Sequence, residues 1–291
     1  MAARFLAANQ ICRVHVHDVT TGIGTLVHSS ATVLFEAPNW TSGGDLILNG
    51  DGVLWRLPAD GSAPPRQVLL DDLPGLNNDH VLDPVSEAAF VSADDGHIYQ
   101  ADLRGGQVRR VTHEDRMHFL HGVSPDGKTL AYVGIEEQRW DAGTLWTIGC
   151  DGGPSMRLTA GGGRDDGPEY TPDGEWIHCN TERFTPGQAQ IARLRPDGSG
   201  LEQLTFDERV NWFPHVSPDG SRAVYLSYPP GTQGHPADRE VELRVVEGGD
   251  WAAARTVVTL AGGQGTINVN SWAPDSRRFA YVDYPFPTAA M

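Results

Sequence analysis

The sequence predicts an all-β protein folded as one six-bladed β-propeller with four antiparallel strands per blade. Three observations support this fold class. A Pro-Asp-Gly motif or a weaker copy of it recurs before short alternating apolar segments. The recurrences are 41 to 56 residues apart, near the period of propeller blades. Finally, each end of the chain supplies two strands of a sixth sheet. The 34 Gly and 20 Pro among 291 residues also indicate a turn-rich β protein.

Each repeat has the same order of elements. A polar leading segment enters the Pro-Asp-Gly turn, in which Pro presets φ, Asp caps the turn and Gly takes the positive φ. An alternating strand follows, as in TLAYVG from Thr129 or RAVYLS from Arg222. A third strand, a DGG or DGSG turn and a closing strand complete a four-stranded blade. The six anchor positions are Ser42, Pro84, Pro125, Pro172, Pro218 and Pro274.

The two ends of the chain predict how the ring closes. CRVHVHDV (12–19) and GTLVHSS (24–30) precede the first complete repeat, and the sixth repeat stops after its second strand, FAYVD (279–283). We expect the N-terminal strands to complete the last blade and so hide its edges. The longest interval holds the insertion YPPGTQGHPADRE (228–240), which we interpret as a loop. No boundary or linker is visible, so residues 1–291 form one predicted domain.

The net charge limits the possible binding partners, and the cysteine content indicates the cellular compartment. The net charge of −16 argues against nucleic acid and acidic membranes as partners. No apolar run is long enough for a signal peptide or a membrane span. Cys12, Cys150 and Cys179 form no CxxC motif and are odd in number, which favours buried free thiols. We therefore expect a cytoplasmic protein.

The repeats also resemble a known family. The SPDG…AY units, with DG and LT closing each blade, resemble the TolB-type, WD-like propeller repeat over nearly the whole chain. The stretch 165–220, with GGQGTINVNSWAPDS (262–276), is similar to a bacterial TolB-like branch often found near carbohydrate-utilisation genes. Such propellers include protein scaffolds, binding proteins and a few polysaccharide lyases such as oligogalacturonate lyase. The resemblance thus implies the fold and leaves these activities open.

The segment before each anchor forms the innermost strand of its blade and lines the central channel. These segments are much more polar than the strands that follow them. Buried polar groups must find partners, which here would be one another, water, a metal or a ligand. The polar residues of the predicted channel ring are Glu36, Asn39, Asn78, Asp79, His80, His121, Asp166, Glu169, Asn211, His215, Asn268 and Asn270.

Histidines in this ring suggest acid–base or metal chemistry. His80 and His121 occupy the same repeat position in consecutive blades, and His215 lies two blades further on. Imidazoles beside carboxylates can bind a divalent metal ion or transfer protons. Alternatively, each histidine bonds between blades. We predict a shared cavity with His80, His121, Glu169 and His215 as catalytic residues, and His80, His121 and His215 as candidate ligands of a divalent metal.

Further residues are predicted to bind the substrate. Trp212 in NWFPH could be a platform for a sugar ring or a packing residue between blades. Glu182 in NTERF follows the second strand of the fourth blade and could instead form an ordinary ion pair. The predicted substrate-binding residues are Glu36, Asn39, Asn78, Asp79, Asp166, Glu182, Asn211, Trp212, Asn268 and Asn270.

Other motifs narrow the function. GGQGTINVN (262–270) lacks GxGxxG and a following Lys, so no nucleotide is expected, and its glycines should bring Gln264 and Thr266 to the channel mouth. Arg164 and Arg183 are the nearest basic residues, which favours a neutral sugar. We predict a central-channel carbohydrate-active enzyme, of lyase or glycoside-cleaving type, acting on a small neutral sugar or glycoside. The alternative is a non-catalytic platform that binds a ligand, or a protein partner on a rim.

Overall fold

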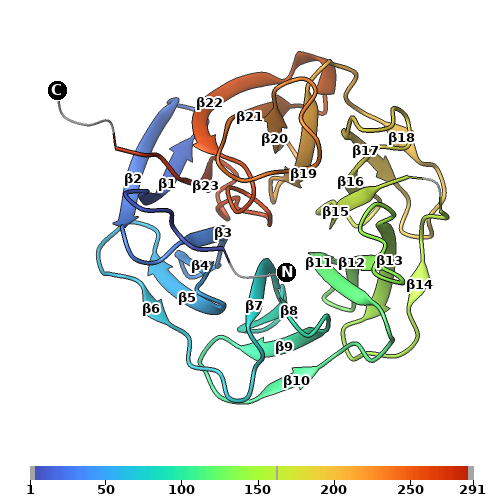
Figure 1. Cartoon of the computed structure of the whole chain (residues 1–291), viewed down its shortest axis with the longest axis horizontal. Coiled ribbons are helices and arrows are strands. Elements are labelled where there is room, and N and C mark those ends of the chain that lie inside the picture. Colours follow the sequence, from blue (N-terminus) through green and yellow to red (C-terminus); the bar gives the residue numbers. More distant parts are fainter. Residues whose placement is uncertain (1–3, 162, 288–291) are drawn as a thin grey trace.

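The computed structural model describes residues 4–161 and 163–287 and forms a six-bladed propeller, viewed along its axis in Figure 1. Five sheets have four antiparallel strands each, ordered outward from the axis in sequence order. The described residues contain one helical element, the short 3-10 helix η1 (Trp251–Ala253). None of the described helices has the length and apolar character needed to span a membrane.

The first three complete blades follow one another along the chain. The first comprises β3 (Phe35–Trp40), β4 (Asp45–Gly50), β5 (Val53–Pro58) and β6 (Arg66–Gln67). The second comprises β7 (Leu76–Leu82), β8 (Ala88–Ala93), β9 (Ile98–Asp102) and β10 (Val108–Arg110). The third comprises β11 (Met117–Val123), β12 (Thr129–Ile135), β13 (Thr144–Gly149) and β14 (Met156–Arg157).

Two further complete blades carry the chain to the closing blade. The fourth comprises β15 (Asp165–Tyr170), β16 (Ile177–Thr181), β17 (Gln190–Leu194) and β18 (Glu202–Gln203). The fifth comprises β19 (Val210–Val216), β20 (Arg222–Tyr228), β21 (Arg239–Glu247) and β22 (Arg255–Gly262). The sixth comprises β1 (Cys12–Asp18), β2 (Ile23–Ser30) and β23 (Arg278–Asp283).

The predicted closure of the ring is confirmed. β1 pairs with β23 from Arg13 opposite Asp283 to Asp18 opposite Arg278, so the two ends of the chain share one blade. The innermost position of this blade is held by an isolated bridge between Trp272 and Phe279. The segment before the bridge contains Gly263, which has φ +114° and lies so close to the Pro236 carbonyl that a Cβ would be 2.2 Å from its oxygen.

Three innermost strands share a bulge near the hub, which is the part of the central channel where side chains of the innermost strands meet. Ala37, Gly167 and Phe213 all have positive φ (52°, 60° and 53°), and each precedes a proline. The register of β3, β15 and β19 shifts at these points. Bulges bend a strand and re-aim its side chains, and a bulky residue with positive φ is unusual enough to suggest a functional constraint.

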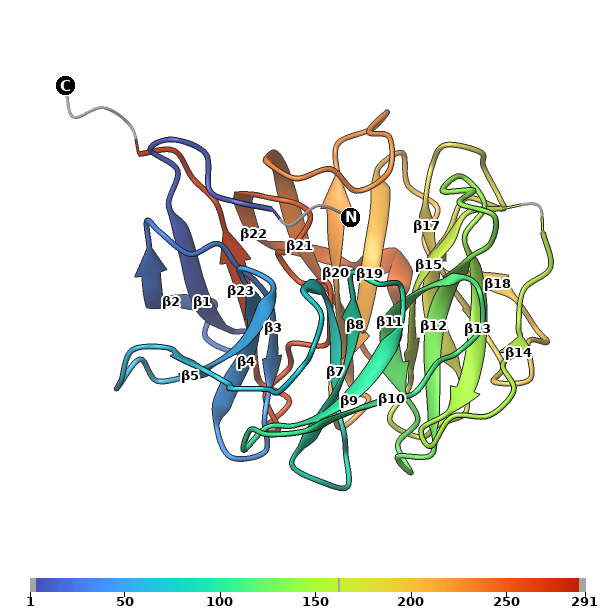
Figure 2. The ribbon, with the colours of Figure 1, turned by 60° about the horizontal axis from the view of Figure 1, so that its bottom comes forward.

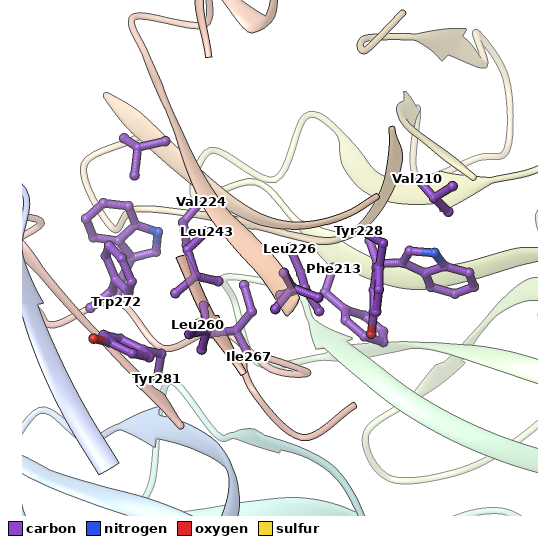
Figure 3. Close-up of a cluster of buried hydrophobic side chains, with 14 of the residues drawn as sticks. Val210, Phe213, Val224, Leu226, Tyr228, Leu243, Leu260, Ile267, Trp272 and Tyr281 are labelled. Carbon is purple, nitrogen blue, oxygen red and sulfur yellow. The ribbon is translucent and has the colours of Figure 1, made fainter. Parts of the chain in front are cut away.

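Apolar side chains fill the spaces between neighbouring blades. The largest cluster joins the fifth and sixth blades, and Figure 3 shows Trp272 and Tyr281 on one side of it and Phe213 and Tyr228 on the other. Burying such side chains contributes roughly 1.5–3 kcal/mol each. All three cysteines are buried and free, as predicted. This packing fixes the innermost strands whose side chains meet at the hub.

Candidate functional site

A cavity of about 360 Å3 lies at one end of the central channel. Its floor comes from the innermost strands, with Asp79 of β7, His121 of β11 and Asp166 of β15. The loop between β20 and β21 contributes residues 233–236. Figure 2 shows this loop rising over the same end of the ring as the N-terminal segment. The insertion predicted as a loop therefore covers the hub.

His121 lies between two aspartates at the centre of this cavity. Its Nε2 is 3.2 Å from Asp166 Oδ1 and 3.9 Å from Asp79 Oδ1. Its Nδ1 is 3.2 Å from the Asn268 carbonyl oxygen, which accepts a hydrogen bond. With only 4% of His121 and 5% of Asp79 exposed, these charges interact away from bulk water.

The two aspartates have pKa values displaced in opposite directions. Burial, reinforced by the charge of Asp166, raises the pKa of Asp79 to about 6 against the opposing charge of His121. Burial also acts to raise the pKa of Asp166, but its hydrogen bond with His121 and the charge of that imidazole lower it overall. Although burial disfavours the charged form of His121, Asp79 and Asp166 raise its pKa to about 9. His121 is therefore a cation at neutral pH.

The covering loop adds a second histidine that the sequence did not identify. His235 Nε2 is 3.7 Å from Asp166 Oδ2, and its Nδ1 is hydrogen-bonded to Gln264. The ring lies 4.3 Å from Trp212 and 5.3 Å from Phe213, measured between centroids. Burial lowers the pKa of His235, so it is predominantly neutral at neutral pH. The insertion has no counterpart in the other repeats, so no repeat position marked this residue.

Aromatic side chains form an apolar wall beside these charges. Phe213 stacks on His121 with ring centroids 5.7 Å apart and an interplanar angle of 23°. Phe119 lies 5.7 Å from Trp140, and both line the cavity. Of the neighbours Trp212 and Phe213, only Phe213 lines the cavity. The proposed platform Trp212 is fully buried in the core behind it, in the packing role considered as its alternative.

A second compartment of about 260 Å3 adjoins the first, and His235, Pro236 and Gln264 line both. Glu36 and Asn78 lie here, and Asn78 Nδ2 is 3.4 Å from Glu36 Oε1. Burial raises the pKa of Glu36 to about 7, and the opposing charge of Arg4 limits this shift. Gln264 donates to Asn78 Oδ1 at 3.1 Å. The predicted approach of Gln264 to the channel mouth is thus observed, whereas Thr266 is fully buried and lines neither compartment.

The hub therefore brings together six of the predicted site residues, namely Asp79, His121, Asp166 and Asn268 in the main cavity and Glu36 and Asn78 in the second compartment. The connection carrying Glu182 lies on the same rim, because Arg164, which lines the cavity, is 3.9 Å from Glu182 Oε1. Glu182 lines neither compartment and has the ion-pair role considered as its alternative.

Glu169 and His215 lie outside both compartments and bind each other across neighbouring blades. His215 Nδ1 is 2.5 Å from Glu169 Oε2, and its Nε2 is 2.5 Å from the Ile267 carbonyl oxygen. The other carboxylate oxygen accepts from Asn270 Nδ2 at 2.6 Å and from the Val216 amide at 3.1 Å. The expected shared cavity does not include these residues, because their hydrogen bonds join three blades.

The remaining predicted residues also face away from the cavity. His80 is 1% exposed, and burial lowers its pKa to about 4 against the effect of the neighbouring Ile47 backbone. Asn211 donates to Gln190 and Asp207 within the fourth and fifth blades. Asn39 is buried in β3 and lines neither compartment. The four proposed catalytic residues all lie in the described part of the chain, and of these four only His121 faces the main cavity.

The predicted metal ligands do not converge. Only His121 of the three candidate histidines lies in the cavity, because His80 and His215 face neighbouring blades. Within residues 4–161 and 163–287, no group of three or more His, Cys, Asp or Glu side chains is arranged to hold a metal ion. The residues at this hub do not fit the predicted metal site.

The fold and the hub define a class of protein: a closed six-bladed propeller with a partly apolar cavity and a buried group of two aspartates and a histidine at one end of its channel. The chain belongs to the TolB-like propeller family that includes "Uncharacterized protein Atu1656" of Agrobacterium fabrum. The two are 41% identical over 261 residues, covering 87% of this chain and 86% of the relative. The solved structure of "putative TolB from Agrobacterium tumefaciens" has a TM-score of 0.88 and 36% identity, covering 98% of this chain and 100% of that chain.

More distant comparisons share the fold. TolB from Acinetobacter baumannii has a TM-score of 0.60 at 18% identity, with 87% of this chain and 64% of that chain covered. Oligogalacturonate lyase in complex with manganese has a TM-score of 0.57 at 16% identity, covering 86% of this chain and 74% of that chain. A TolB homolog of Chlorobium luteolum is 32% identical over 144 residues, 49% of this chain but only 31% of the relative. No protein-family model matches the chain.

Proposed function

We propose that this protein is a cytoplasmic carbohydrate-active enzyme whose hub cavity takes a small neutral sugar or glycoside. Asp79, His121 and Asp166 are its acid–base group. The supporting observation is that two aspartates beside one imidazole have oppositely shifted pKa values. A carboxyl group with a pKa of about 6 can both give and accept a proton near neutrality. An inert channel needs no such arrangement.

The cavity's size and lining favour a neutral, sugar-like ligand. Its volume of about 360 Å3 lies in the range of small-molecule sites. Phe213 and Phe119 offer apolar faces, while Gln233 offers an amide that can read hydroxyl groups. The two nearby arginines are paired: Arg183 binds Asp165 at 2.7 Å and Arg164 lies near Glu182. Arg183 is therefore committed to Asp165, and Arg164 alone remains to meet an anionic group, which is too little positive charge for a polyanion.

The fold can support such chemistry, since oligogalacturonate lyase shares it. Two reactions suit the group. In a β-elimination on a sugar that carries a carbonyl, the Asp79 carboxylate would remove a proton next to that carbonyl, the His121 cation would stabilise the developing enolate, and the oxygen substituent on the β-carbon would leave and take a proton from water. In glycoside cleavage, protonated Asp79 would donate its proton to the leaving oxygen while a water molecule adds to the anomeric carbon and gives its proton to the Asp166 carboxylate. An unsaturated, ultraviolet-absorbing product identifies the first reaction, and a new reducing end identifies the second.

The test is a thermal-shift screen against neutral mono- and disaccharides, their glycosides and their uronates, followed by product analysis. A ligand that binds only the folded state raises the melting temperature. His121→Gln should abolish the shift, whereas His178→Gln, which removes a buried histidine outside the hub, should retain it. No shift with any neutral sugar, or an equal shift in both variants, would overturn the proposal.

A second candidate function is binding of a protein partner on the rim that carries the cavity. Exposed aromatic side chains favour it: Trp140 is 44% exposed, Phe184 41% and Phe206 77%. Phe184 lies in the same connection as Glu182, which is on this rim. Gln188 of that connection donates to the carbonyl of Asp207, the residue after Phe206, at 2.9 Å, so Phe206 lies on this rim as well. A contiguous exposed apolar patch can mark an interaction site, and a partner that contacts all three side chains would bury them together. Loss of a partner on Phe206→Ser with sugar binding intact would support this role.

A further inference from the structure

The guanidinium of Arg4 is held by four groups at the edge of the second compartment, two of which, Glu36 and Gln264, line it. Its Nη1 donates to Glu36 Oε1 at 2.8 Å and to the Gln264 carbonyl oxygen at 2.5 Å. Its Nη2 is 3.6 Å from Asp238 Oδ1, and its Cζ lies 4.6 Å from the centre of the Tyr284 ring. A carboxylate, a carbonyl and an aromatic face together are the groups that recognise a guanidinium.

These acceptors belong to the propeller and are held by contacts other than those with Arg4. The Tyr284 hydroxyl donates to the Phe35 carbonyl at 2.9 Å, and Asn78 lies within hydrogen-bond reach of Glu36. We call the acceptors around the Arg4 guanidinium (Glu36, the Gln264 carbonyl, Asp238 and the Tyr284 ring) the cradle. Gly265 leaves space for it, because a Cβ there would lie 2.5 Å from both Glu36 Oε1 and the Tyr284 hydroxyl oxygen. The cradle should therefore persist when Arg4 is removed.

Space remains beside the Arg4 side chain. The second compartment, of about 260 Å3, is lined by Arg4 itself together with Asn49, Asp51 and Asn77. It continues toward the main cavity past His235 and Gln264, which line both. A molecule bearing a guanidinium could place that group on Glu36 and the rest of its body along the channel.

We propose that the second compartment is a binding site for the guanidinium group of a ligand, and that Arg4 occupies it as a tethered competitor. Glu36 is 8% exposed, and a buried carboxylate without a partner cation is strongly disfavoured. The site therefore favours cations. Its acceptors face both terminal nitrogens, with Glu36 and the Gln264 carbonyl at Nη1 and Asp238 at Nη2. The Tyr284 ring lies against the planar group, so the set suits a guanidinium better than a compact ammonium. Because a short tether gives an effective concentration in the millimolar range, Arg4 should weaken ligand binding about tenfold or more.

The test uses the full chain with Arg4→Ala and methylguanidinium as the probe. Methylguanidinium should raise the melting temperature of Arg4→Ala and bind it about tenfold or more tightly than it binds the wild type, measured by calorimetry. Methylurea, the neutral isostere, should give no shift. Glu36→Gln in the Arg4→Ala background should abolish binding. Asp238→Asn, on a more exposed carboxylate, should weaken binding less and serves if Glu36→Gln does not fold.

Two further arms complete the test. Agmatine and a short arginine-containing peptide, compared on Arg4→Ala, distinguish a free small molecule from a peptide side chain as the source of the guanidinium. His121→Gln should leave methylguanidinium binding unchanged, which separates this site from the proposed sugar site. No binding to Arg4→Ala, equal binding of methylurea, or binding insensitive to both Glu36→Gln and Asp238→Asn would overturn the proposal.

Discussion

The buried His121 cation makes a quantitative prediction about stability and pH. Its pKa rises from 6.5 to about 9 on folding, because the attraction of Asp79 and Asp166 exceeds the desolvation cost. At 1.36 kcal/mol per pKa unit, the protonated imidazole contributes about 3 kcal/mol to the free energy of unfolding. The folded state binds this proton more tightly, so the contribution is complete below pH 6.5 and is lost as the pH rises through about 9.

Urea unfolding of the wild type and of His121→Gln at about pH 6 and about pH 10 measures this contribution. Three other buried histidines, His80, His118 and His178, have pKa values lowered to about 4 and so release their protons below this window. Ionisation of the cysteines in the unfolded state is common to both proteins and cancels in the comparison. The wild type should lose up to about 3 kcal/mol more than the variant between the two pH values, the difference being reduced because Asp79 without the His121 cation has a higher pKa and makes the variant pH-dependent as well.

Asp166→Asn is the matched control, because it leaves the imidazole in place and removes the nearer carboxylate. Its pH-dependent loss should be smaller than that of the wild type and should begin at lower pH. Parallel stability curves for wild type and His121→Gln across this range would refute the charged imidazole and the acid–base group built on it.

Three further predictions test the hub. Glu169→Ala should destabilise the protein by about 3–5 kcal/mol in urea unfolding, because it leaves His215 and other buried donors without their acceptor; a loss below about 1 kcal/mol would contradict the blade-joining role. Gly265→Ala should lower stability by about 1–3 kcal/mol, because φ is +90° and its Cβ would meet Glu36, and an unchanged melting temperature would argue against the cradle. Phe213→Ala should weaken sugar binding about tenfold, whereas Trp212→Ala should mainly lower stability by about 3–5 kcal/mol; the reverse pattern would restore Trp212 as the platform.

The fold was predictable because its determinants are local and repeated. The turn motif that contains Pro125 and Gly127 recurs at the period of a blade, each time followed by an alternating strand. The number of strands at the two ends of the chain predicted that the ring closes in a shared blade. The last blade differs in its innermost position, where Gly263 and Gly265 let the chain turn irregularly. Two glycines in the sequence do not show that the innermost strand of this blade is reduced to a single bridge between Trp272 and Phe279.

The site was only partly predictable, because repeat position does not fix side-chain direction across a bulge. His80 and His121 share a position, yet the register of β7 shifts between Leu76 and His80 whereas that of β11 shifts between Leu120 and Gly122. His121 consequently faces the axis and His80 faces the neighbouring blade. The sequence did contain a signal for the bulge. A proline stands at the same repeat position in three leading segments, after Ala37, Gly167 and Phe213.

Calorimetric titration of the best-shifting neutral sugar from the screen tests the proposed hub site most directly. Wild type and His178→Gln should bind it with equal affinity, and His121→Gln should bind at least about tenfold more weakly, a difference of about 1.4 kcal/mol. Equal affinity for wild type and His121→Gln would place the ligand elsewhere and contradict the assignment of the hub cavity as the functional site.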